Sequence, residues 1–197
     1  MLKGIDISQW QGDVDYSKIG MDFVIFKVSE GVGFVDKKFI RNQTECRKTP
    51  MTVGYYHFAR PDLGNSAESE ADFFLKTIGT IKVGELLCLD FEVSYIDCVN
   101  WCLKWLDRVY EKTGYKPLIY LNQSQIHTYN WQPIIDKSYG LWAAIYDYTP
   151  ENFGYSLKWP VIAFKQYTNK LQVSGIVGNV DGDSFNGDKN ILLKYAY

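Results

Sequence analysis

The chain has 197 residues, of which 46% are hydrophobic, and a formal net charge of −2. This length and apolar fraction suit one globular domain with a full core, so we expect a single domain over residues 1–197. No apolar run approaches the ~20 residues of a membrane span, and scattered Lys and Arg residues give no basic patch, so we expect neither membrane nor nucleic-acid partners.

The N-terminus and the cysteines indicate a cytoplasmic origin. The first residues contain one cation and then Asp6, where a secretion signal would have its apolar stretch. We therefore expect synthesis in the cytoplasm without a signal peptide. Cys46, Cys88, Cys98 and Cys102 lack zinc spacing and have no accompanying His pair, so they are predicted to be reduced thiols and no metal or cofactor is expected from them.

Apolar runs and helical patterns alternate along the chain. Strands are predicted at residues 4–8, 22–28, 51–58, 86–93, 117–121, 140–146, 161–167 and 176–180, and helices at 39–48, from Ser66 onward and at 95–112. Repeated strand–helix–strand units form right-handed parallel crossovers, so eight strands predict a closed α/β barrel of the TIM type. Because 197 residues fall short of the ~250 of a full barrel, we expect an irregular barrel with reduced helices in its second half.

The run at residues 86–93 is apolar until Asp90 and Glu92 appear at its end. Side chains alternate across a strand, so these two acids are expected on one face, with Phe91 packed behind them. Two neighbouring carboxyl groups repel each other, which predicts a raised pKa for one of them. A protonated acid beside an ionised one is the arrangement that a glycosidase needs.

Other acids are predicted at the same rim of the barrel. Asp6 ends the first strand, Glu30 follows the second, and Asp181 follows the last. All parallel strands of such a barrel end at one rim, so these carboxyl groups should meet Asp90 and Glu92 there. Taken alone, Asp6 fits a turn cap equally well, and the imidazole of His57 fits a buried structural role better than a catalytic one.

Aromatic residues are plentiful and several stand at predicted strand ends. Trp10 lies in a polar loop after the first strand, and the strand-end rings are Tyr55, Tyr56, Tyr120, Trp142, Tyr146 and Tyr167. A flat ring with a polar tip can stack on a sugar and bind its hydroxyl groups. Each of these rings would also suit a core position.

Six strand-end motifs follow one another in order: GIDIS at 4–8 with Trp10, KVSEG at 27–31, GYYHFAR at 54–60, LDFE at 89–92, Gln166-Tyr167 and Val180-Asp181. Together they resemble glycoside hydrolase family 25, the Chalaropsis-type muramidases of phage endolysins and bacterial autolysins. The resemblance implies a flattened, irregular (β/α) barrel. It also implies hydrolysis of the β-1,4 bond between N-acetylmuramic acid and N-acetylglucosamine in peptidoglycan.

The resemblance also suggests roles for single residues. Glu92 matches the proton donor of the family and Asp90 the carboxylate two positions before it, while Asp6 and Asp181 match two further acids. Asp90 would either attack the sugar directly or orient the acetamido group of the substrate. Substrate binding is expected from Tyr56, Glu30, Tyr120, Trp142, Gln166 and Trp10. Lys165 departs from the family, in which many members have Trp before the Gln-Tyr pair.

Several alternatives stay open at this point. A chitinase-like endo-N-acetylglucosaminidase also ends a strand in Asp-x-Glu, four acids with His57 could hold Mg²⁺ or Mn²⁺, and an inactive barrel could bind glycan as a lectin does. The chain ends at Tyr197, just after the expected barrel, so we expect either that a wall-binding module has been removed or that the domain works alone. We expect a monomer that reaches the bacterial cell wall by phage-type release.

Overall fold

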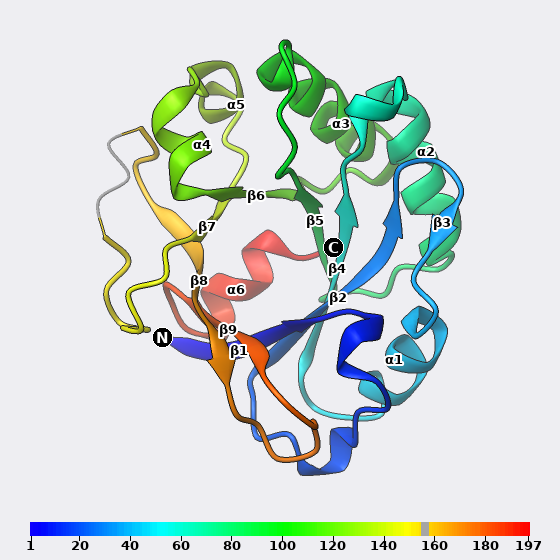
Figure 1. Cartoon of the computed structure of the whole chain (residues 1–197), viewed down its shortest axis with the longest axis vertical. Coiled ribbons are helices and arrows are strands. Elements are labelled where there is room, and N and C mark those ends of the chain that lie inside the picture. The colour runs from blue at the N-terminus through cyan, green and yellow to red at the C-terminus, as the bar shows by residue number, and fades with distance from the viewer. Residues whose placement is uncertain (155–157) are drawn as a thin grey trace.

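Eight strands close into a barrel in the computed structural model, which describes residues 1–154 and 158–197. They are β1 Leu2–Ile7, β2 Phe23–Glu30, β4 Thr52–Phe58, β5 Leu86–Asp90, β6 Leu118–Asn122, β7 Leu141–Ala144, β8 Ile162–Leu171 and β9 Val180–Phe185. The ring is closed because β1 pairs with both β2 and β9 (Figure 1). The short strand β3, Phe34–Val35, adds an antiparallel edge to β2. The predicted irregular α/β barrel is confirmed.

The last strand differs from its prediction in position and in direction. We expected a parallel strand over residues 176–180, whereas β9 begins at Val180 and runs antiparallel to both β8 and β1. The apolar stretch before it contains Gly175 and Gly178 with φ of 93° and 88°, a left-handed backbone that interrupts a strand. These glycines let the chain turn back on β8, so β9 enters the barrel from the rim.

Long helices cover only the first half of the barrel. These are α1 Phe39–Cys46, α2 Ala67–Ile78 and α3 Cys98–Thr113, whereas α4 Gln123–Thr128, α5 Gln132–Asp136 and α6 Lys189–Leu192 are short. Between β7 and β8 the described residues contain no helix, and residues 155–157 lie outside the described part. The expected reduction of the later helices is confirmed. None of the helices in the described ranges is long and apolar enough to cross a membrane.

The boundaries of the longer helices follow from local chemistry. The backbone N–H of Ser69 donates to Ser66 Oγ at 3.1 Å, which caps α2 at the predicted residue. Gly114 ends α3 with a left-handed φ of 75°, and the helix extends one residue beyond the predicted range. However, α3 begins three residues later than expected, because its first helical bond runs from the N–H of Trp101 to the carbonyl of Asp97.

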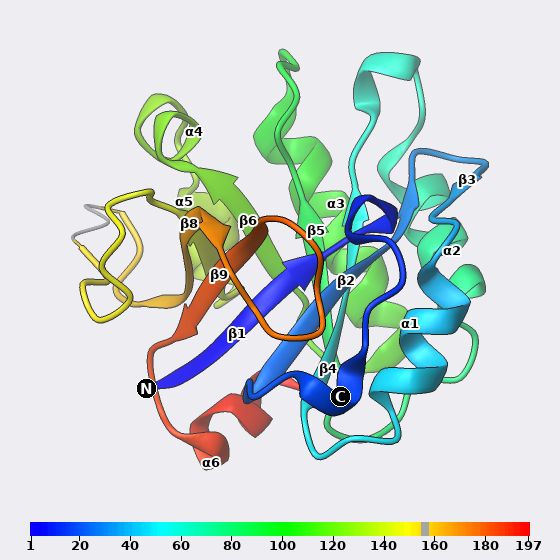
Figure 2. The ribbon, with the colours of Figure 1, turned by 60° about the horizontal axis from the view of Figure 1, so that its bottom comes forward.

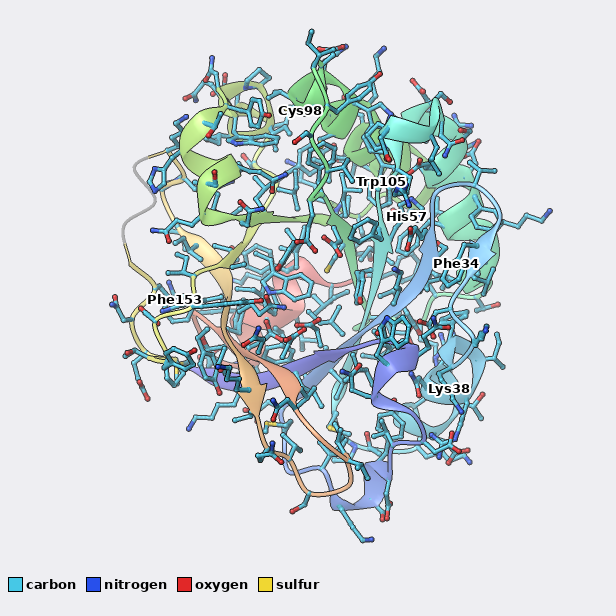
Figure 3. The ribbon with its side chains drawn as sticks, viewed as in Figure 1. Phe34, Lys38, His57, Cys98, Trp105 and Phe153 are labelled. Carbon is cyan, nitrogen blue, oxygen red and sulfur yellow. The ribbon has the colours of Figure 1, made fainter. Side chains whose placement is uncertain are left out.

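Two apolar layers support the barrel. The outer layer lies between the sheet and the helices and contains large rings such as Trp105, which Figure 3 labels beside His57. The inner layer fills the barrel, where Phe164 packs on Phe23 and Phe185 at ring separations of 5.3 Å and 4.7 Å. Helix α6 lies across the lower end of the barrel, and its Leu192 belongs to this inner layer (Figure 2). The apolar filling and α6 therefore leave the opposite rim as the open end of the barrel interior.

Candidate active site

A polar pocket of about 140 Å³ opens at the rim where β1 and β4 to β8 end. Its lining contains all four predicted catalytic acids and four of the predicted substrate-binding residues: Asp6, Tyr56, Asp90, Glu92, Tyr120, Trp142, Tyr146, Gln166 and Asp181. A larger hollow of about 760 Å³ lies between the turn at Tyr16–Lys18 and α1, and it contains none of these acids. The chemistry points to the smaller pocket.

The four acids reach this pocket from different elements. Asp6 in β1 lies opposite Asp181 in β9, because the two strands pair antiparallel in that register. Asp181 is therefore at the rim as the second residue of an entering strand, and not as the end of a parallel one. Strand β5 ends at Asp90 and not at residue 93 as predicted, so Glu92 lies in the following loop. Both acids still line the pocket, and Phe91 between them is buried as expected.

Asp90 and Glu92 form a coupled pair of carboxyl groups. Asp90 is buried at the base, whereas Glu92 is exposed at the mouth of the pocket. Burial and the neighbouring charge of Glu92 raise the pKa of Asp90 well above its usual range. The side chain of Glu92 is exposed as a whole, but the protein atoms around its carboxyl group reduce the hydration of the charge and raise its pKa as well. The two carboxyl groups lie close enough to act on each other's pKa, which favours a proton held by one of them. This pair can therefore both donate and accept a proton at one site.

A second network fixes the opposite wall of the pocket. Gln166 Nε2 donates to Asp6 Oδ2 at 2.6 Å, and Gln166 Oε1 accepts from the hydroxyl groups of Tyr120 at 2.9 Å and Tyr146 at 2.6 Å. Burial raises the pKa of Asp6, and so do the charges of its acidic neighbours. Burial together with the charge of Glu92 raises the pKa of Asp181 to about 6. Every acid of the pocket thus favours its protonated form more than it would in water.

Two predicted binding residues lie outside this pocket. Glu30 is held in ion pairs with Lys27 at 2.7 Å and Arg60 at 2.8 Å. Trp10 is 84% exposed, in the turn at Gln9–Gln11 that follows β1. Their contact with a longer substrate stays a prediction.

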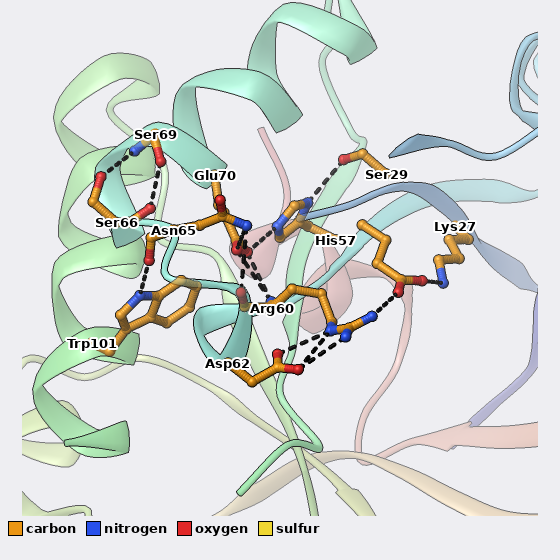
Figure 4. A network of polar contacts seen from close by, with 11 residues as sticks. Lys27, Ser29, His57, Arg60, Asp62, Asn65, Ser66, Ser69, Glu70 and Trp101 are labelled. Carbon is orange, nitrogen blue, oxygen red and sulfur yellow. Dashed lines mark hydrogen bonds and ion pairs between the residues drawn. The ribbon is translucent and has the colours of Figure 1, made fainter. Parts of the chain in front are cut away.

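His57 is also separate from the four acids. Its ring is buried between the sheet and α2, with Nδ1 2.9 Å from Ser29 Oγ and Nε2 2.8 Å from Glu70 Oε2 (Figure 4). Because a carboxylate only accepts hydrogen bonds, Nε2 carries the proton and Ser29 donates to Nδ1. The structural role expected for this imidazole is confirmed, and the arrangement does not place it beside Asp6 or Asp90 as a shared metal ligand.

Trp142 lines the pocket in an unexpected way. Its ring is 2% exposed and is in an edge contact with Tyr120, so almost no ring face is open to a sugar. Instead its Nε1–H donates to Asp183 Oδ1 at 2.9 Å. In this conformation, the ring forms part of the pocket wall and its polar edge holds a further acid behind that wall.

Comparison with known proteins identifies the family. A sequence model described as Glycosyl hydrolases family 25 matches residues 5–176. The chain belongs to this family. It is therefore a glycoside hydrolase, and its rim pocket with four acids is the candidate active site of such an enzyme.

Relatives of known structure or name agree with this assignment. Lysozyme M1 of Streptomyces globisporus is 28% identical, over 99% of this chain and 71% of its own length. The bacterial lysozyme of Streptomyces coelicolor superposes with a TM-score of 0.84 at 27% identity, over 99% of this chain and 96% of that one. The endolysin CTP1L gives a TM-score of 0.82 at 34% identity, over 98% of this chain and 70% of the other.

Sequence reasoning missed two polar residues of this family 25 site. Asp183 was not singled out, although its i, i+2 spacing from Asp181 in a strand would have placed both on one face. Lys165 was noted only as a departure from the family. It is fully buried beneath the loop after β7, where Nζ bonds Asp147 Oδ1 at 2.6 Å and the carbonyl of Thr149 at 3.0 Å.

Proposed function

We propose that this family 25 enzyme is a muramidase that hydrolyses the β-1,4 bond between N-acetylmuramic acid and N-acetylglucosamine in peptidoglycan. The observation that carries the proposal is the Asp90–Glu92 pair, with raised pKa values, in a rim pocket of four acids. The lysozyme names of the relatives in Streptomyces support the choice of substrate.

Glu92 is suited to protonate the leaving group, because it is the exposed member of the pair and the glycosidic oxygen can approach it from solvent. The shared proton moves to Glu92 and then to that oxygen as the bond to the sugar C1 breaks. Glu92, now a carboxylate, takes a proton from the water that attacks C1 in the second half of the reaction. The same side chain thus serves as general acid and then as general base.

The position of Asp90 favours assistance by the substrate over direct attack. A carboxylate nucleophile and its acid partner stand about 5 to 5.5 Å apart across the scissile bond in retaining glycosidases. Here the two groups stand two residues apart on one chain segment and act on each other's pKa, and Asp90 is the deeper one. From that position Asp90 can accept the N–H of the acetamido group, so that the acetamido oxygen attacks C1 and forms a cyclic intermediate.

The negative charge of the remaining acids supports this intermediate. Asp181 lies close enough to Glu92 for the two charges to influence each other, and Asp6 lies beside Asp181 across the strand pair. We infer that Asp181 helps to keep the pair proton in place before substrate binds. Once the proton has moved to the leaving oxygen, the Asp181 carboxylate offsets the positive charge that develops at C1.

The first test is digestion of purified peptidoglycan, followed by borohydride reduction and mass spectrometry of the reduced sugar. The wild-type protein is expected to give reduced muramic acid, and Glu92→Gln is expected to be slower by ~10²- to 10⁴-fold, because the general acid is lost. Glu111→Gln makes the same change on the surface of α3 and should act like the wild type.

Each result has a clear meaning. Reduced glucosamine would assign the protein to the endo-N-acetylglucosaminidases instead. Glycan binding without new reducing ends would favour an inactive glycan-binding barrel. A Glu92→Gln variant as fast as the wild type would remove Glu92 from the acid role.

The setting of the activity follows from the substrate. We infer that the enzyme acts on the bacterial cell wall, as a single catalytic domain over residues 1–197 and as a monomer. Release by a phage-type route and cooperation with a separate wall-binding module complete the proposal, and the endolysin relative supports it. Light scattering of the purified protein tests the monomer, since a dimer would double the mass of 22.8 kDa.

A further inference from the structure

Asp183 is a buried acid directly behind the active-site wall. It lies two residues after Asp181 in β9, so both side chains point to the inside of the barrel. Its partner across the strand pair is Gly4, which has no side chain, and a Cβ there would lie 2.3 Å from Phe23 Cε2. Asp183 therefore sits between the polar pocket above and the apolar filling below, with no access to solvent.

The contacts of Asp183 leave one of its oxygens without an amide or hydroxyl donor. Trp142 Nε1 donates to Oδ1 at 2.9 Å, whereas Oδ2 has no such partner among the described residues. The Asp6 carboxyl group is the diagonal neighbour of Asp183 across the β1–β9 strand pair, and the two groups act on each other's pKa. Two carboxyl groups can bond only if one of them is protonated.

No cation is available to neutralise this pair. Among the described residues, the titratable groups that interact with the pair are an acid, a thiol and four phenols: Asp181 in β9, Cys88 in β5, Tyr56 in β4, Tyr120 in β6, Tyr167 in β8 and Tyr146 after β7. Two ionised carboxylates in such a place would repel each other without compensation. The pair is therefore expected to retain one proton.

We propose that Asp183 is a positioning residue that shares one buried proton with Asp6 and thereby fixes the orientation of the active-site wall. This inference rests on the proposed function, because the wall is given a role in catalysis. It adds a residue that does not line the pocket itself.

The orientation passes from this proton to the pocket through Gln166. When Asp6 donates its proton to Asp183, its Oδ2 accepts from Gln166 Nε2 at 2.6 Å. The amide oxygen of Gln166 must then face the hydroxyl groups of Tyr120 and Tyr146, which both donate to it. The tyrosine lone pairs are left to accept hydrogen bonds from the substrate. Loss of the proton would leave Asp6 and Asp183 as repelling carboxylates and release this chain of contacts.

The pair also has a consequence for stability. Burial raises the pKa of Asp183 to about 8, and burial raises the pKa of Asp6 as well. An aspartate in the unfolded chain titrates near ~3.9, so the folded protein binds protons at this pair more tightly than the unfolded chain does. The stabilisation is fully present below the unfolded value and is lost as the pH rises through about 8.

Asp183→Asn tests the proposal, because an amide can accept from Trp142 and donate permanently to Asp6. The alkaline limb of kcat against pH is expected to move up by about one pH unit or more, since the wall no longer depends on a proton that titrates. Thermal unfolding without substrate should depend less on pH between roughly pH 6 and pH 9 than in the wild type. Asp136→Asn, on the surface, should leave both curves unchanged.

An Asp183→Asn variant with the wild-type alkaline limb and the wild-type pH dependence of unfolding would overturn the proposal. If this variant does not fold, Asp6→Asn must show the same flattening of the unfolding curve, because it removes the same proton from the other side. The unfolding measurement needs no activity. A wild-type protein that releases no muramic acid would therefore refute the proposed function and leave the test of the proton pair intact.

Discussion

Tyr56 and His57 are successive residues of β4 that face opposite sides of the barrel wall. Each side contains buried carboxyl groups, and the two sides differ in how many hydrogen-bond donors these groups have. Outside the barrel, the carboxylate of Glu70 is completely buried and fully supplied with donors. It accepts from His57 Nε2 at 2.8 Å, from the backbone N–H of Arg60 at 3.1 Å and from Asn65 Nδ2 at 3.0 Å (Figure 4). Its charge is part of a closed network that ties α2 to the sheet.

Inside the barrel, the polar neighbours of the acids are mainly other acids. Asp90 lies beside Glu92, and Asp6 lies beside Asp183, and each pair favours holding a proton because the neighbouring charges raise the pKa. Lys27 is the cation whose charge lowers the pKa of Asp90 and Glu92, but its Nζ is bound to Glu30 at 2.7 Å. Carboxylates with donors hold structure together, whereas carboxyl groups that face each other hold protons ready for transfer.

The largest effect that separates the two regions is expected from Asp90→Asn. The amide cannot share an acidic proton with Glu92, so kcat should fall by ~10²- to 10⁴-fold. The free energy of unfolding at pH 7 should stay the same or rise, because the substitution removes a buried acid that has few hydrogen-bond donors. Turnover of peptidoglycan and urea unfolding measure the two quantities.

The same substitution at Asp136, which is exposed on α5, is the control and should change neither turnover nor unfolding. A strong loss of stability in Asp90→Asn would show that this acid is structural, and the contrast between the regions would fail.

Glu70→Gln should give the reverse result with a smaller effect. Its new NH₂ group would face the donors of His57, Arg60 and Asn65, so at least one buried donor loses its acceptor. A loss of about 1–3 kcal/mol in the free energy of unfolding is expected. Turnover by the folded variant at 25 °C should stay close to the wild type, since Glu70 does not line the pocket.

Glu68→Gln, on the exposed side of the same helix, provides a matched comparison and should unfold like the wild type. A Glu70→Gln protein that is as stable as the wild type but slow on peptidoglycan would contradict the division of roles.

The sequence predicted the inner region well because its residues follow simple rules. Strand ends in a parallel barrel share a rim, so Asp6 and Asp90 were expected together, and the structure places both in the pocket. Glu92 was placed there for the wrong reason, since β5 ends before it. Asp181 was expected at the end of a parallel strand, and it arrives at the start of an antiparallel one.

The outer region and the supports of the pocket were harder to predict. Glu70 is an acidic residue in the first turn of α2, and only the fold shows that it meets His57 inside the protein. Asp183 and Lys165 act through partners that are distant in sequence, such as Trp142 and Asp147. Periodicity assigns a residue to a face of a strand, but it does not tell which loop or strand will cover that face.

The smallest expected effect concerns Lys165, the buried cation that links the outside of β8 to the pocket wall. Its Nζ holds the loop of residues 147–152 through Asp147, Thr149 and Asn152, and Tyr146 directly precedes this loop. Lys165→Met keeps the buried volume but removes these bonds, so Tyr146 should lose its fixed contact with Gln166. KM should rise about threefold to tenfold, or ~1 kcal/mol in binding, with a smaller change in kcat because the acids stay in place.

Lys116→Met is the matched control, since Lys116 also bonds a backbone carbonyl, that of Lys137 at 2.6 Å, but on the surface away from the pocket. Its KM should equal that of the wild type. An unchanged KM in Lys165→Met would mean that the loop holds Tyr146 without this lysine. A loss of kcat as large as that of Glu92→Gln would instead mean that Lys165 controls the position of the catalytic acids. Lys165 would then have to be counted among the residues on which the chemical step depends.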